Sequence, residues 1–208
     1  MATHQTSKDL VRILTACVLL FVALETAANE PATPGEEPPQ AGRAPSGGSA
    51  KRFGGVDNPN IDSAAYLRLA SDAITHREPR RLSEDQFIRL ARKPGVVILD
   101  ARSPAKYGAL HVRGAINLNF ADITVDSLDA LLPDKSTTIL IYCNNNFRDA
   151  PDPMPVKLIA AALNLATYTS LYTYGYRNVY ELGPNLSVRS TRIPFEGTWV
   201  ESIRSPVN

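Results

Sequence analysis

Short apolar runs alternate with longer amphipathic stretches from about residue 58 onward, and this pattern predicts strands separated by helices. Residues 96–99 and 137–142 are apolar at nearly every position, which is typical of strands buried on both faces. A further strand is predicted at residues 179–182. Alternation of such strands with helices predicts the α/β class, with a central, mainly parallel sheet covered by helices on both faces in three layers.

The starts of the predicted helices carry residues that cap helices. Ser83, with Gln86 three residues later, forms a capping box ahead of an apolar stretch. We expect helices after Asp62 or Ser63, after Ser83, after Ser103-Pro104, at residues 127–132 and at residues 156–166, with a tyrosine-rich segment to Tyr174 following the last.

The first 28 residues have the layout of a secretory signal peptide. Lys8 and Arg12 precede an apolar run at residues 13–24, and small residues follow up to Ala28. The run is shorter than the roughly 20 residues of a membrane-spanning helix and ends at Glu25, so we expect cleavage near Ala28 rather than a permanent anchor. The mature protein is then expected to be periplasmic or secreted, with no stable membrane insertion after cleavage.

The rest of the chain divides into a linker and one globular domain. Residues 29–57 are rich in Pro, Gly and Ser and show no apolar period, which predicts a disordered tether. Residues 58–208 provide one domain, and its last stretch, residues 183–208, is expected to pack on it as an arm. The formal net charge of +1 gives no reason to expect nucleic acid as a partner.

The candidate chemistry lies at Cys143. The chain has 2 cysteines, and Cys17 would leave with the signal peptide, so Cys143 has no partner for an internal disulfide. It follows the strand at residues 137–142, and the carboxyl ends of parallel strands are where α/β proteins place their sites. The helix expected at residues 156–166 would face it with a positive dipole end and lower the thiol pKa. From these residues alone, a nucleophilic thiolate and an inert buried cysteine remain equally open.

A wider pattern resembles the rhodanese-like domains. The block consists of an apolar strand, Asp-x-Arg, a tyrosine, a histidine and Gly-Ala-x-Asn, and it is followed by a cysteine after the central strand and by a glycine-aromatic entry to the last strand. The resemblance covers residues 82–183. The matching residues are Asp100, Arg102, Tyr107, His111, Gly114, Ala115, Asn117, Cys143 and residues 174–179.

The resemblance implies a sulfurtransferase that needs neither cofactor nor metal. In that family the cysteine takes a sulfane sulfur from a small sulfur-containing anion such as thiosulfate, forms a persulfide, and passes the sulfur to a thiol or another thiophile. Cys143 would be the nucleophile and Arg148 the ligand of the donor anion. The backbone cradle would come from Asn144, Asn145, Asn146 and Phe147, and structural support from Asp100, Arg102 and His111.

Other functions remain as alternatives. A phosphatase of the same architecture needs five residues between its cysteine and arginine, and only four separate Cys143 from Arg148. A papain-like protease needs a histidine partner, for which His76 and His111 offer no convincing context. The main alternative is a non-catalytic module that uses the same scaffold for binding or redox sensing. The insertion at residues 149–155 delays the helix that follows, which bears on how well that helix faces Cys143.

Overall fold

The computed structural model describes residues 58–204. The signal peptide predicted at residues 1–28 and the linker predicted at residues 29–57 lie outside the described residues, as does the end of the predicted domain beyond Arg204. Within residues 58–204, every helix is too short or too polar to cross a bilayer.

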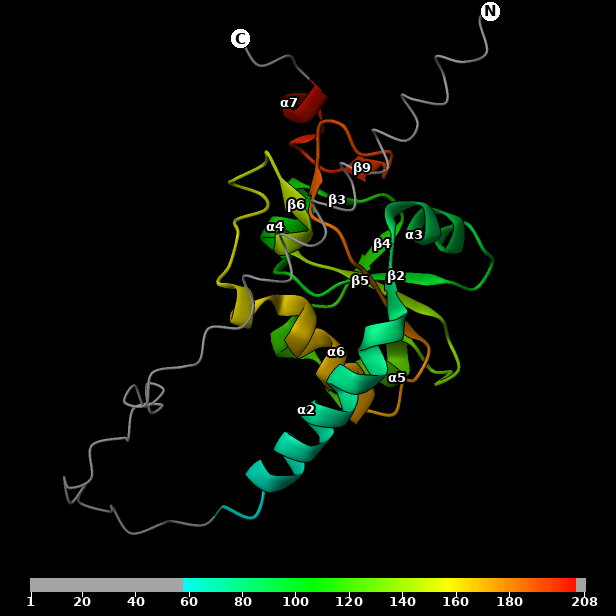
Figure 1. Ribbon diagram of the computed structural model, residues 1–208, viewed down its shortest axis with the longest axis vertical. Coiled ribbons are helices and arrows are strands. Elements are labelled where there is room, and N and C mark those ends of the chain that lie inside the picture. The colour runs from blue at the N-terminus through cyan, green and yellow to red at the C-terminus, as the bar shows by residue number, and fades with distance from the viewer. Residues whose placement is uncertain (1–57, 205–208) are drawn as a thin grey trace, which may run out of the picture. The chain divides into compact units, whose positions relative to one another are not determined.

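A five-stranded parallel sheet forms the centre of the domain (Figure 1). Its spatial order is β1-β7-β5-β2-β4, and each neighbouring pair runs parallel. The predicted α/β class and parallel sheet are therefore confirmed. The strands are β1 Arg81–Leu82, β2 Val97–Asp100, β4 Ala115–Asn117, β5 Ile139–Tyr142 and β7 Val179–Leu182.

Helices cover both faces of this sheet (Figure 1). One apolar cluster joins α2, α5 and α6 to the sheet, and a second joins α3, α7 and the C-terminal segment to the opposite face. The helices are α2 Ser63–Arg77, α3 Glu84–Ala91, α4 Pro104–Ala109, α5 Val125–Leu131, α6 Leu163–Thr173 and α7 Val200–Arg204. Short 3-10 turns lie at η1 Glu78–Arg80, η2 Phe120–Asp122, η3 Asn144–Asn146 and η4 Ile159–Ala161.

The central strand β5 shows how the two clusters share one sheet. Ile139 and Ile141 belong to the cluster under α2 and α6, whereas Leu140 and Tyr142 belong to the cluster on the other face. All four side chains are buried. Side chains of a strand alternate between faces, so a strand covered on both sides must be apolar throughout.

Two of the caps predicted from the sequence form their hydrogen bonds, whereas Ser103 precedes α4 without a side-chain cap bond, with Pro104 at the first helical position. The Asp62 side chain accepts the Ala65 N–H at 2.8 Å and begins α2. Ser83 and Gln86 form both hydrogen bonds of the capping box at α3. At α5, a second capping box between Thr124 and Ser127 starts the helix at Val125, slightly earlier than the predicted residue 127.

The helix predicted at residues 156–166 is wrong. The backbone N–H and C=O of Lys157 bond to the Asn145 side chain, at 3.0 and 2.9 Å, which removes them from any helix. Helix α6 begins instead at Leu163 and takes up the tyrosine-rich segment to Thr173. It does so because Tyr168 and Leu171 are fully buried against the sheet, whereas Leu158 and Ile159 are exposed.

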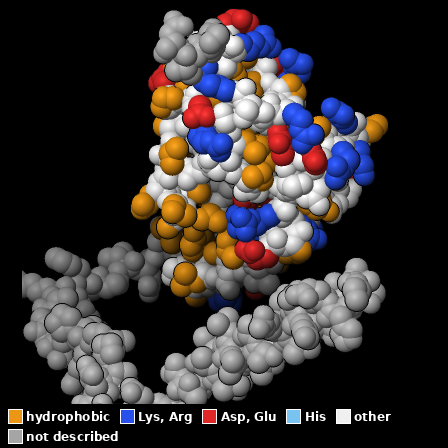
Figure 2. Space-filling view, turned by 45° about the horizontal axis from the view of Figure 1, so that its top comes forward, with side chains coloured by type: hydrophobic (Ala, Val, Ile, Leu, Met, Phe, Trp, Pro, Cys, Tyr) orange, Lys and Arg blue, Asp and Glu red, His pale blue; other side chains and the backbone are white. Residues whose placement is uncertain are grey.

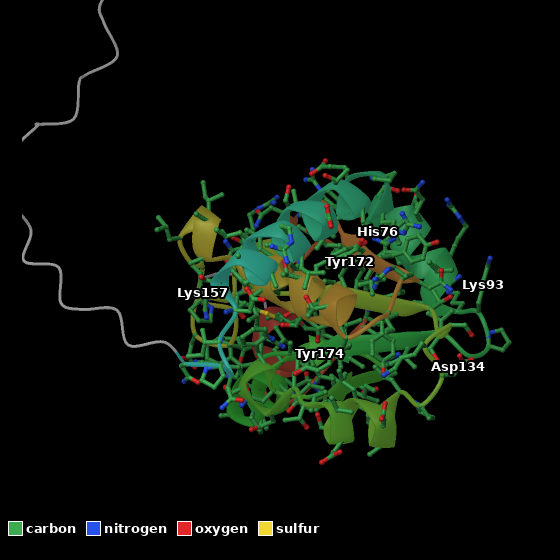
Figure 3. All side chains as sticks on the ribbon, turned by 90° about the horizontal axis from the view of Figure 1, so that it is seen from below. His76, Lys93, Asp134, Lys157, Tyr172 and Tyr174 are labelled. Carbon is green, nitrogen blue, oxygen red and sulfur yellow. The ribbon has the colours of Figure 1, made fainter. Side chains whose placement is uncertain are left out.

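Helices α2 and α6 pack against one another through aromatic side chains. His76 and Tyr172 lie side by side (Figure 3), with ring centroids 5.1 Å apart. The His76 Nδ1 atom also lies 2.8 Å from the Tyr168 hydroxyl. These contacts hold the end of α2, and the arginines that follow it, over the sheet.

The C-terminal segment packs on the domain as predicted, as far as it is described. Two small sheets fasten it: β3 His111–Val112 pairs antiparallel with β9 Phe195–Glu196, and β6 Phe147–Arg148 pairs parallel with β8 Leu186–Ser187. Ile193 and Ile203 are buried. Gly197 has φ +123°, which side-chain-bearing residues rarely adopt, and a Cβ there would also collide with the Ala109 carbonyl, so this position requires glycine.

Candidate active site

Cys143 lies at the carboxyl end of β5, with its side chain under the N-terminus of α6. Only 2% of the residue is exposed. The backbone N–H groups of Asn164, Asn145 and Leu163 act on its sulfur as hydrogen-bond donors. Since Leu163 and Asn164 are the first two residues of α6, the positive end of that helix faces the thiol. The residues between β5 and α6 therefore bring the helix to the sulfur, although it begins later than predicted.

The pKa of the Cys143 thiol is raised, not lowered as the sequence led us to expect. Burial is the largest cause, because it penalises the charged thiolate, and the Glu181 carboxylate adds to it. The N–H groups of Asn164, Asn145 and Leu163 act in the opposite direction without reversing the shift. The sequence predicted that a helix would face the thiol, but it did not show how deeply the thiol is buried or that Glu181 acts on it.

Asn146 holds the loop through its side chain as well as through its backbone N–H, which faces the Cys143 side chain in a capping box at η3. Its Oδ1 accepts the Cys143 N–H at 2.8 Å and the Asn164 Nδ2–H at 2.9 Å. Its Nδ2 donates to the Leu182 carbonyl at 2.6 Å. One buried amide thus ties the ends of β5 and β7 to the start of α6, and it fixes the loop that carries the thiol.

The two neighbouring asparagines have different places. Asn145 faces the thiol with its backbone N–H and fastens Lys157 with its side chain. Asn144 is buried, and its Oδ1 has no hydrogen-bond partner among the described residues. Of the predicted cradle, the structure therefore places the backbone N–H groups of Asn145 and Asn146 against the Cys143 side chain.

Phe147 and Arg148 are turned away from the thiol. Phe147 is fully buried in the apolar cluster under α3 and α7, edge-on to Tyr142 and Phe195. The Arg148 guanidinium donates to the Asn185 carbonyl at 2.8 Å, with its side chain about half exposed. Neither lines the cavity at Cys143. The roles predicted for both are corrected: the Phe147 backbone N–H donates to the Asn144 carbonyl rather than facing the sulfur, and pairing of β6 with β8 brings Arg148 to Asn185.

A cavity of about 410 Å³ opens beside Cys143. Among its lining residues are three charged side chains that the sequence analysis did not single out, Arg77, Arg81 and Glu181. Glu181 in β7 is paired in register with both Arg81 of β1 and Ile141 of β5. Cys143 lies two residues beyond Ile141, so these side chains form a row on one face of the sheet, at its carboxyl edge.

Arg77 reaches down from the end of α2 to complete this row. Arg77 donates two hydrogen bonds to the buried Glu181 carboxylate. One runs from Nε to Oε2, and the other runs from Nη2 to Oε1 at 2.6 Å. The hydrogen bond to Glu181 raises the pKa of Arg77, so the guanidinium stays charged. The sequence contained a signal for this ion pair: Glu181 is a single carboxylate inside an otherwise apolar strand, and arginines occupy positions 77, 80 and 81.

Asp100 and Arg102 form a buried ion pair beside the apolar cluster that contains Tyr142 and Leu110. Arg102 Nη2 lies 2.5 Å from Asp100 Oδ2 and also donates to the Leu110 carbonyl at 2.6 Å. Its Nη1 donates to the Pro153 carbonyl at 3.1 Å. The Tyr142 hydroxyl donates to the same carboxylate at 2.5 Å. The pair thus joins β2, β5, α4 and the insertion at residues 149–155, which is the place expected of framework residues.

His111 lies outside the cavity. Its Nδ1 is 2.8 Å from the Tyr107 carbonyl, and its ring stacks on Tyr107 with centroids 3.8 Å apart. Its Nε2 lies 3.6 Å from a Glu196 carboxylate oxygen. These contacts fasten α4 to the C-terminal segment, away from the thiol. In the part of the chain that the structure describes, no three His, Cys, Asp or Glu side chains come together as metal ligands.

With the fold and the surroundings of Cys143 described, comparison with protein families shows which class the domain belongs to. The family model described as "Rhodanese-like domain" matches residues 83–182. The chain therefore contains a rhodanese-like domain, whose single described cysteine is Cys143.

Several solved structures are similar to this chain. The rhodanese-like domain of the Alr3790 protein from Anabaena is 22% identical, with a TM-score of 0.42 over 62% of this chain and 86% of that one. The BH2092 protein from Bacillus halodurans is 20% identical, with a TM-score of 0.42 over 64% and 85%. Thiosulfate sulfurtransferase from Pseudomonas aeruginosa is 21% identical, with a TM-score of 0.42 over 64% and 22%. None of the curated proteins matches this chain.

Proposed function

We propose that this chain is a sulfurtransferase in which Cys143 carries a sulfane sulfur as a persulfide. One observation supports this most strongly: three backbone N–H groups, two of them from the N-terminus of α6, act on a sulfur that borders a cavity of about 410 Å³. Such an arrangement stabilises negative charge on a thiolate and on the persulfide that it becomes. The rhodanese-like domain supports the same chemistry.

The transfer has two steps and needs no metal. The Cys143 thiolate attacks the outer sulfur of a small sulfur-containing anion, so a bond from Sγ to that sulfur forms while the donor's own bond to it breaks. The electron pair leaves with the rest of the donor. A thiolate or another thiophile then attacks the outer sulfur of the persulfide and releases Cys143 as the thiolate.

The test uses the full-length protein and peptide mass spectrometry. After incubation with thiosulfate, and separately with an organic persulfide, we expect the peptide that contains Cys143 to gain the mass of one sulfur atom. The gain should disappear on addition of cyanide, with thiocyanate formed, and should be absent in Cys143→Ser. Failure of every donor to modify Cys143, under conditions that leave the protein folded, would overturn the proposed function.

A second candidate is a non-catalytic module that uses Cys143 for binding or redox sensing. Two observations favour it: the residue is only 2% exposed, and burial raises the pKa of its thiol. Such a module would show no sulfur gain in the test above but a reversible change of Cys143 under mild oxidation. Sulfur gain that cyanide reverses excludes this candidate.

We also propose that the protein is exported, with a domain at residues 58–208 on a tether. The charged residues, apolar run and small residues that end at Ala28 support this. The expected outcome is a mature chain that begins at Asn29 and is recovered from the periplasm or the medium. N-terminal sequencing and intact mass measurement would show it, and an uncleaved chain that stays with the membrane would contradict it.

A further inference from the structure

We propose that the sulfur donor is a small organic persulfide that carries an ammonium group beside its sulfur, rather than a bare inorganic anion. This inference rests on the proposed sulfurtransferase function and specifies the substrate class of the same site. It follows from the hydrogen-bonding groups that line the cavity, which include unused acceptors as well as cations.

The first unused acceptor is Asn164. The residue lines the cavity, only 4% of it is exposed, and its Oδ1 has no hydrogen-bond partner among the described residues. The orientation of this amide is fixed, because its Nδ2 donates to Asn146 Oδ1, whose own Nδ2 is committed to the Leu182 carbonyl. A buried carbonyl oxygen without a donor costs free energy, so a ligand that brings an N–H stabilises the site.

The second acceptor is Glu181. Its side chain is 5% exposed and lines the same cavity, and each of its oxygens accepts one hydrogen bond from Arg77. A carboxylate oxygen has two lone pairs, so capacity remains on both atoms. The carboxylate also disfavours further negative charge nearby, as its contribution to the raised pKa of Cys143 shows.

Arg81 and an apolar wall complete the recognition. Arg81 lines the cavity with a side chain that is 46% exposed. Its Nη1 lies 3.7 Å from the exposed Glu78 carboxylate, a loose pair that leaves guanidinium N–H groups for a ligand carboxylate. Ile159, Ala162 and Leu165 line the cavity as well. Arg77, Arg81 and Glu181, together with Glu78, which lies 3.6 and 3.7 Å from the two arginines, sum to a formal charge of zero while Cys143 is a thiol. The cavity therefore suits a ligand whose own charges balance.

Thiosulfate fits this cavity poorly on chemical grounds. It is a dianion without a hydrogen to donate, so it leaves Asn164 Oδ1 unsatisfied and places two negative charges near Glu181. An amino-acid persulfide offers an ammonium to Asn164 and Glu181, a carboxylate to Arg81, and a carbon chain to the apolar wall. The cavity, at about 410 Å³, lies in the range of small-molecule sites.

The step balances as a simple exchange. The Cys143 thiol and R–S–SH give the Cys143 persulfide and R–SH. The bond from Sγ to the outer sulfur forms, the S–S bond of the donor breaks, and the departing thiolate takes up the proton that Cys143 released. No oxidant or reductant is consumed.

Binding of an unreactive analogue tests the recognition separately from sulfur transfer. S-methylcysteine has a methyl group in place of the outer sulfur, and N-acetyl-S-methylcysteine lacks the ammonium. We expect calorimetry on the full-length protein to show about tenfold tighter binding of S-methylcysteine, as for one hydrogen bond to a charged group. Glu181→Gln should abolish this preference, and Asp126→Asn, on the exposed side of α5 outside the cavity, should leave it unchanged.

A second variant guards against loss of folding. Glu181→Gln leaves Arg77 without its carboxylate, so Arg77→Gln/Glu181→Gln replaces the ion pair by two neutral amides that can bond to each other. This double variant should also lose the preference for the ammonium. A preference that persists in a folded double variant would contradict the role of Glu181.

Transfer assays complete the experiment and separate the two proposals. Persulfides of cysteine and of N-acetylcysteine are compared with thiosulfate by the sulfur gained at Cys143, and we expect the cysteine persulfide to react fastest. If all donors modify Cys143 equally and both analogues bind alike, the substrate class is wrong while the sulfurtransferase stands. If S-methylcysteine binds selectively but no donor modifies Cys143, the sulfurtransferase is wrong while the ammonium recognition stands.

Discussion

The chemistry of Cys143 depends on two effects that act on one atom. Burial takes the sulfur out of water and raises its pKa, and the Glu181 carboxylate adds to that rise. The N–H groups of Asn164, Asn145 and Leu163 favour the thiolate. The burial effect is larger, so at neutral pH the group is mostly a thiol that is well placed to become an anion once a donor is bound.

The reactivity of Cys143 should therefore rise with pH beyond the ordinary range of a thiol. Because its pKa is raised, the thiolate fraction, and with it the rate of alkylation by iodoacetamide, should increase about tenfold per pH unit up to at least about pH 8.5. Mass spectrometry of the Cys143 peptide measures this rate. Glutathione in parallel should level off first, and a plateau of the Cys143 rate near neutral pH would contradict the raised pKa.

Asn146 offers a second prediction at the residue scale. In Asn146→Asp the Nδ2 donor becomes an oxygen that faces the carbonyls of Leu182 and Pro184, which lie 2.6 and 3.4 Å from that atom. Loss of a buried donor should lower the free energy of unfolding by about 1–3 kcal/mol. Urea denaturation measures it, with Asn60→Asp on the exposed N-terminal segment as the control. Equal stability of the two variants would show that the Asn146 amide does not hold the loop.

Elements follow their local sequence where a cap is present. The capping box of Ser83 and Gln86 was visible in the sequence, and both of its hydrogen bonds form at α3. Helix α6 is different, since its N-cap residue Ala162 makes no side-chain cap. Its start is set by the packing of Tyr168 and Leu171, and this is why the prediction at residues 156–166 failed.

The cap of α3 is testable by a single substitution. Ser83→Ala removes the oxygen that accepts the Gln86 N–H at 3.3 Å, and it should lower the free energy of unfolding by about 1 kcal/mol. Thermal and urea denaturation measure the change. Ser71→Ala, at an exposed position inside α2, is the matched control and should be nearly neutral. A cost at Ser71 as large as that at Ser83 would argue against capping as the cause.

At the scale of the whole molecule, the ion pair of Asp100 and Arg102 holds separate parts of the chain together. Arg102 bonds to Leu110 after α4 and to Pro153 in the insertion, while Asp100 accepts the hydroxyl of Tyr142 in β5. Charges on the surface are arranged differently: Figure 2 shows side chains of both signs interspersed over the face it presents. Stability should therefore be far more sensitive to the buried charges.

Asp100→Asn tests that sensitivity. The variant leaves the Arg102 guanidinium, 2% exposed, without a carboxylate, and the free energy of unfolding should fall by about 3–5 kcal/mol. Asp129→Asn breaks the exposed pair with Lys135, which are 2.9 Å apart, and should cost no more than about 1 kcal/mol. Both are measured by urea denaturation. If both variants lost a similar amount of unfolding free energy, the buried pair would contribute no more to stability than the exposed one.

The sequence by itself determined the parallel α/β architecture, the caps of α2 and α3, the strand at residues 179–182 and the placement of Cys143 after β5. These features depend on apolar runs and on hydrogen bonds within a few residues, which a linear pattern records. Tertiary structure alone decided where α6 begins, that Arg148 turns away, and that Arg77, Arg81 and Glu181 line the cavity at Cys143. Those outcomes depend on burial and on contacts between residues far apart in the chain, such as the ion pair of Arg77 with Glu181. A local sequence pattern does not record such contacts.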